Sequence, residues 1–147
     1  MKKNVFIMML IAVFAISSCN SVSNVMSSDT AAKTMGTTCG ASLSNLYKAY
    51  KSSGKLSITD SNVLNNVFAI SSSTMNLKEN AKNSAYRTSY ISGLVAGSAG
   101  LLTETKAANV YNKLVSTNEA ISSVNSSSSE NKLLSAVNAI TTILQLF

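Results

Sequence analysis

The chain has 147 residues, carries a formal net charge of +6 and contains no histidine, proline or tryptophan. This length is enough for one domain and not for two. The absence of histidine excludes Ser-His-Asp and Cys-His catalytic sets, and it removes the commonest ligand of catalytic zinc. We therefore expect no metal site and no cofactor. The basic residues are scattered singly, so we also expect no nucleic-acid partner.

The first element in chain order is an export signal. Lys2 and Lys3 precede an apolar run from Val5 to Ile16, and Ile16-Ser17-Ser18-Cys19 closes the run. About a dozen apolar residues are too few to cross roughly 30 Å of hydrocarbon, which needs about 20. Residues 1–18 are therefore predicted to be a cleaved signal peptide rather than a membrane span.

This segment resembles the lipobox signal of bacterial lipoproteins, and its end is similar in style to small lipoproteins of Bacteroidetes. The resemblance implies that the Cys19 thiol receives a diacylglyceryl group, that cleavage follows Ser18, and that the lipid holds the mature protein on a membrane. Asn20, where an aspartate would suggest retention in the inner membrane, favours the outer membrane. No acidic cluster follows, which favours a periplasm-facing domain. An ordinary signal peptide that ends beside a cysteine is the alternative.

Residues 19–37 are predicted to form a lipidated flexible tether. They are small and polar and show no sustained periodicity, so they cannot bury enough apolar surface to offset the entropy of ordering. In an alternative interpretation, Ser28 and Asp29 cap a short helix over Thr30 to Met35.

Residues 38–147 are predicted to form an all-α domain of about five helices. Apolar residues recur at spacings of three and four, while the alternation typical of strands is sustained nowhere beyond a few residues. Short loops between such helices predict a small antiparallel helical bundle or an irregular helical array. Four of the expected helices cover residues 41–52, 60–74, 79–102 and 130–147. Another is capped by Thr103-Glu104 and carries an apolar stripe from Ala107 to Val115, with Ile121 and Val124 as a possible continuation.

The third expected helix contains Gly93, Gly97 and Gly100. Each glycine costs about 1 kcal/mol relative to alanine in a helix interior, so something must offset it. Close approach of a neighbouring helix is the expected compensation. Gly93-x-x-x-Gly97 also matches a membrane-helix dimer motif. A membrane-inserting hairpin and a helix break near Gly97 to Gly100 are the alternatives.

Cys39 is the only cysteine that remains if Cys19 carries lipid, so no intramolecular disulfide is expected. We expect Cys39 to be a small buried residue beside the first helix. An intermolecular disulfide or a reactive thiol is the alternative.

The carboxylates offer little for catalysis. Four of the six lie at or near expected helix starts, where a negative charge complements the helix dipole: Asp60, Glu79, Glu104 and Glu130. Ser52-Ser53-Gly54-Lys55 fits the Ser-x-x-Lys motif of β-lactamases, but its companion motifs are absent.

Tyr86, Arg87 and Tyr90 are the candidate binding residues. The tyrosines of this chain lie on or beside apolar stripes, where a core-edge position explains them. In the alternative, several of them line a groove, and Arg87 supplies its polar contact.

Together these features predict a non-enzymatic outer-membrane lipoprotein whose domain binds another component of the envelope, such as a protein. The alternative is a small carrier of apolar ligands or lipids, with the glycine-rich helix lining a cavity. A hydrolase and a pore-forming protein rank behind these two.

Overall fold

The computed structural model describes residues 28–147, and these residues form helices and loops without a strand. The predicted all-α fold class is confirmed. The signal peptide, Cys19 and residues 20–27 lie outside the described range. No helix within it has both the length and the apolar character needed to cross a membrane. The helices are α2 (Ser28–Ser53), α3 (Ser61–Thr74), α4 (Ser84–Gly97), α5 (Glu104–Ser116), α6 (Asn118–Ser122) and α7 (Glu130–Leu144).

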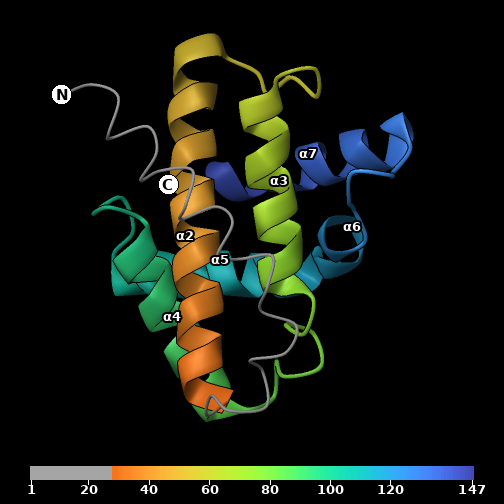
Figure 1. The fold of residues 1–147 in the computed structure, drawn as a ribbon. Helices are drawn as coiled ribbons and strands as arrows, with labels where there is room; N and C mark the ends of the chain where they lie inside the picture. Colours follow the sequence, from red (N-terminus) through yellow and green to blue (C-terminus); the bar gives the residue numbers. More distant parts are fainter. Residues whose placement is uncertain (1–27) are drawn as a thin grey trace, which may run out of the picture.

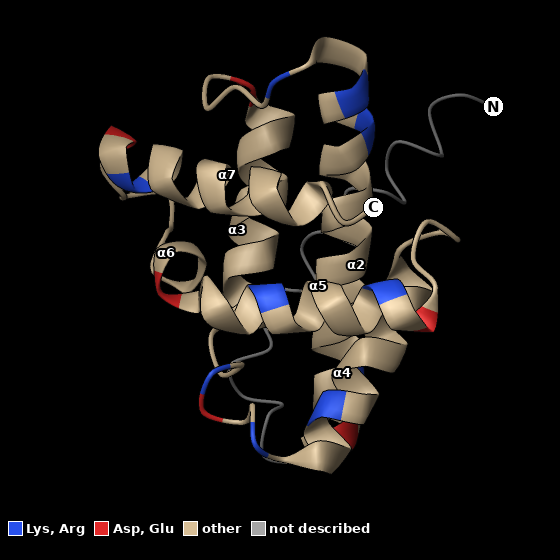
Figure 2. Cartoon of the chain, turned by 180° about the vertical axis from the view of Figure 1, so that it is seen from behind, with Lys and Arg blue, Asp and Glu red and all other residues tan. Residues whose placement is uncertain are grey.

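The helices form a bundle in which two run across the others. Figure 1 shows α2 and α3 side by side and antiparallel, with α5 and α7 crossing behind them. Figure 2, seen from the opposite side, places α5 and α7 in front. Helix α3 returns the chain to the end of the molecule where α2 begins. Helix α4 starts there and runs parallel to α2, since Gly36 lies against Tyr90 and Gly40 lies against Leu94. The arrangement is therefore not antiparallel throughout.

The predicted tether is wrong from residue 28 onward, because Ser28 to Thr37 form the first turns of α2. Ala32 is completely buried and Gly36 is buried as well. Small residues carry little hydrophobicity, which made this segment resemble a linker. Their small size is what lets α2 lie directly against α4, so the folded domain begins about ten residues earlier than expected.

The contact between α2 and α4 is backbone to backbone and uses glycines on both helices. A Cβ atom placed on Gly36 would lie 2.1 Å from the Tyr90 carbonyl oxygen, and one on Gly40 would lie 2.5 Å from that of Leu94. In the other direction, a Cβ on Gly93 would lie 2.2 Å from the Lys33 carbonyl oxygen. The expected close approach of a neighbouring helix is confirmed, and α2 is that neighbour.

Helix α4 is shorter than predicted at both ends. It starts after Asn83, whose side chain accepts hydrogen bonds from the backbone N–H groups of Ala85 and Tyr86 at 3.1 Å. Glu79 therefore lies in the preceding loop and does not cap the helix. The helix ends at Gly97 and is followed by two residues with positive φ, Ala99 at 51° and Gly100 at 84°. A left-handed backbone terminates a helix, so the break considered near these glycines is the correct interpretation.

The other helix boundaries follow their capping residues. Asp60 caps α3 by accepting from the Asn62 N–H at 2.8 Å, and Thr103 caps α5. Gly54, with φ of 72°, follows the end of α2 as expected. The expected continuation of α5 is a separate short helix, α6. The C-terminus docks onto the domain, since the Phe147 ring stacks on Tyr47 at 5.3 Å between centroids.

One apolar core joins all six helices. Its largest fully buried side chains come from every helix and from the loop after α3: Tyr90, Tyr111, Leu43, Leu46, Ile70, Leu77, Leu94, Leu114, Ile121, Ile140, Ile143 and Val67.

Candidate functional site: an asparagine-lined cleft between α2 and α3

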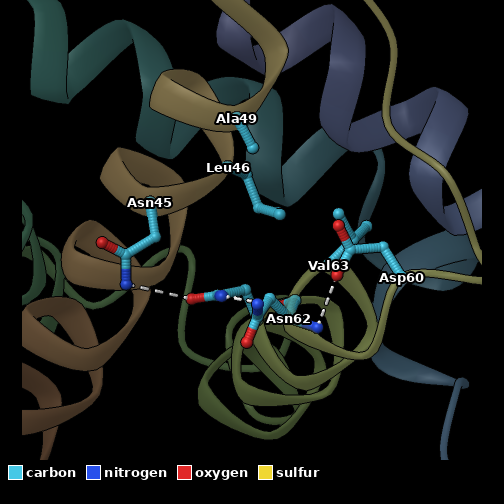
Figure 3. A pocket seen from close by; sticks show the side chains of 7 residues that line it. Asn45, Leu46, Ala49, Asp60, Asn62 and Val63 are labelled. Carbon is cyan, nitrogen blue, oxygen red and sulfur yellow. Dashed lines mark hydrogen bonds between the residues drawn. The ribbon is translucent and has the colours of Figure 1, made fainter. Parts of the chain in front are cut away.

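A cleft of about 340 Å³ lies between the second half of α2 and the first half of α3. Figure 3 shows side chains from α2 and α3 facing each other across it. Its lining residues lie closer to the end of α2 and the start of α3 than to the opposite ends of these helices. The lining residues are Asn45, Leu46 and Ala49 of α2, the capping residue Asp60, and Asn62, Val63 and Asn66 of α3.

Carboxamides from the two helices meet in the cleft. The Asn45 Nδ2 donates to Oδ1 of Asn66 at 3.3 Å, and the Asn66 Nδ2 donates to the backbone oxygen of Asn62 at 2.8 Å. These two bonds fix the Asn66 side chain between α2 and α3. Among the described residues, the Asn45 side-chain oxygen and the whole Asn62 carboxamide make no hydrogen bond, so both are available to a ligand.

Apolar side chains lie beneath these amides. Leu46 is completely buried, Val63 is 3% exposed, and Ala49 is half-buried. Leu46 and Val63 therefore belong to the core and offer a ligand almost no surface, so the accessible lining of the cleft is mainly its polar side chains and Ala49. Its single carboxylate, Asp60, already accepts a hydrogen bond as the N-cap of α3. Such a site provides hydrogen bonds and van der Waals contact rather than proton transfer.

The predicted binding residues Tyr86 and Tyr90 do not line a groove. Tyr86 is 5% exposed and Tyr90 is completely buried. The Tyr90 hydroxyl donates to the Ser73 carbonyl oxygen at 3.1 Å, and the Tyr86 hydroxyl donates to Sδ of Met35 at 3.7 Å. They serve the core because their rings pack together, with centroids 6.1 Å apart.

Arg87 is exposed beside this aromatic cluster rather than inside a binding site. Its guanidinium carbon lies 5.8 Å from the centre of the Tyr111 ring, and its Nη2 donates to Oδ1 of Asn112 at 3.4 Å. Burial raises the pKa of Tyr86 to about 12 and the pKa of Tyr90 well above its ordinary value. Both tyrosines therefore stay protonated and neutral at physiological pH.

Cys39 is completely buried inside α2, which confirms the structural role expected for it. Burial raises the pKa of its thiol to about 11, although hydrogen bonding with Tyr90 and Ser73 partly offsets this rise. A thiol that is inaccessible and protonated is neither a nucleophile nor available for an intermolecular disulfide.

The glycine-rich helix does not line a cavity, contrary to the carrier hypothesis. The space beside Gly93 and Gly97 is filled by the backbone of α2. A second, more open hollow of about 310 Å³ lies elsewhere, between α5 and the C-terminus. The residues that line it are Asn109, Asn112, Lys113, Ser116 and Leu146.

Sequence reasoning missed the cleft residues because amides form no recognised motif. A usable signal exists in retrospect, since Asn62 and Asn66 are four residues apart and share one helix face. Asn45 could not have been paired with them, because that contact depends on how α2 packs on α3. In the range 28–147, no three histidine, cysteine, aspartate or glutamate side chains gather closely enough to hold a metal ion.

No protein-family model, curated protein or solved structure matches this chain.

Proposed function

We propose that this protein is an outer-membrane lipoprotein whose helical domain binds another envelope component without catalysing a reaction. The observation that supports the proposal is the position of the lipobox-like Ile16-Ser17-Ser18-Cys19. Its cysteine lies nine positions before Ser28, the first residue of α2. Nine residues span at most about 30 Å. An acylated Cys19 would therefore hold the domain close to the membrane surface. The absence of acidic residues from Asn20 to Val25 favours a domain that faces the periplasm.

The position of the cleft supports a binding role. Asn45 lies about 25 Å along α2 from Ser28, at the helix rise of about 1.5 Å per residue. The chain enters the domain at Ser28, the first residue of α2, and the α2 residues that line the cleft lie in the second half of this helix. A domain anchored through its N-terminus would thus present the cleft away from the lipid headgroups, where a partner can reach it.

The chemistry of the cleft also supports binding rather than catalysis. Carboxamides do not ionise at neutral pH, so they can orient a ligand but cannot act as general acids or bases. Nucleic acid is not part of the proposal. Seen in Figure 2, basic residues are spread over several helices and interspersed with acidic ones, with their closest grouping near the end of α2.

Membrane fractionation of a Cys19→Ala variant tests the anchor. Without the thiol no lipid can be attached, so we expect the protein to lose the detergent-dependent membrane association of a processed lipoprotein and to stop incorporating labelled fatty acid. Cys39→Ala is the matched control, because it also removes one thiol but leaves the anchor intact. Fatty-acid labelling that survives Cys19→Ala would refute the anchor.

Mild crosslinking in cells followed by purification tests the binding role. We expect one envelope component to be recovered with the wild-type protein and with Cys39→Ala. Recovery of no protein, glycan or lipid under these conditions would contradict the binding role even if the anchor is present.

A further inference from the structure

We draw no further inference here: the strongest candidate, the surface patch of the exposed lysines Lys48, Lys51 and Lys55 at the end of α2, carries no proposal because nothing in the structure shows which anionic partner covers it.

Discussion

Gly93 lies where the contact between α2 and α4 leaves no room for a side chain. An added Cβ would lie 2.2 Å from the Lys33 carbonyl oxygen and 2.7 Å from the Thr37 amide nitrogen. Both atoms belong to the backbone of α2, so they cannot move aside without shifting the helix. The glycine thus costs helix propensity locally and makes the closest helix pair of the described domain possible.

We predict that Gly93→Ala lowers the free energy of unfolding by about 2 kcal/mol. Overpacking typically costs about 1–3 kcal/mol, and the gain of about 1 kcal/mol in helix propensity offsets only part of a clash with backbone. Urea denaturation followed by circular dichroism measures the change. Ser92→Ala, at an exposed neighbouring position, should change stability by less than about 0.5 kcal/mol. A Gly93→Ala protein more stable than wild type would show that the helices can separate freely.

Cys39 predicts a specific loss of stability at alkaline pH. Its thiol has a pKa of about 11 in the folded protein against an ordinary value of 9.0, because burial disfavours the thiolate. The unfolded chain therefore releases this proton first, and stability is complete below pH 9 and falls as pH rises towards 11. The full loss is on the order of 3 kcal/mol.

Urea midpoints measured at intervals from pH 8 to pH 11 check this prediction. Cys39→Ala should show no decline until about pH 10, where the buried tyrosines begin to contribute. Burial raises the pKa of Tyr86 from 10.0 to about 12, and it also raises the pKa values of Tyr90 and Tyr111 above 10.0. An identical decline from pH 9 in wild type and variant would contradict the assignment to Cys39.

Single residues differ in how far the sequence could predict their roles. The cap at Asp60 and the burial of Cys39 follow from local pattern, and both are confirmed. The core positions of Tyr86 and Tyr90 agree with the simpler interpretation of the tyrosines rather than with the groove. The contact between Asn45 and Asn66 joins residues 21 apart in the chain, and no local pattern encodes it.

Among the elements, α6 depends most on its neighbours. It has five residues, too few for a stable helix on its own. The buried Asn118 side chain donates from Nδ2 to the backbone oxygen of Thr74 at 2.7 Å. In the other direction, the Ser71 hydroxyl of α3 donates to the backbone oxygen of Val124 at 2.8 Å. These two bonds tie the segment of α6 to α3.

We predict that Asn118→Ala destabilises the domain by about 2 kcal/mol, because it leaves the buried Thr74 oxygen without this donor. Amide hydrogen exchange should accelerate most within α6 and the end of α3. Asn131→Ala, on the exposed side of α7, serves as the control and should leave exchange unchanged. Uniform acceleration across all helices would mean that α6 does not open on its own.

The first turns of α2 carry too few large apolar residues for periodicity to predict a helix there. Periodicity detects helices through large apolar residues, and residues 28–37 contain only Met35 of that kind. The stabilising contacts there involve Ala32 and Gly36, whose value depends on a partner helix that begins at Ser84. For α3 and α5, in contrast, a cap and a regular apolar stripe agree, and the predicted starts are correct.

For the whole molecule, the domain boundary can be tested by truncation. We predict that a chain beginning at Ser28 unfolds cooperatively, with a midpoint close to that of the full chain. A chain beginning at Thr38 removes Ala32 and Gly36 and exposes the face of α4 around Gly93, so it should lose cooperative unfolding. Thermal melts followed by circular dichroism distinguish the two. If the two truncated chains had the same melting midpoint and cooperativity, residues 28–37 would not belong to the folded domain and would be part of the tether.

The central claim is that a lipid on Cys19 fixes this helical domain to a membrane. Mass spectrometry of the protein extracted from bacterial membranes tests it most directly. We expect a mature chain that begins at Cys19 and carries the added mass of a diacylglyceryl group, with or without a further acyl chain. A chain that retains Met1, begins at another residue, or carries an unmodified Cys19 would contradict it.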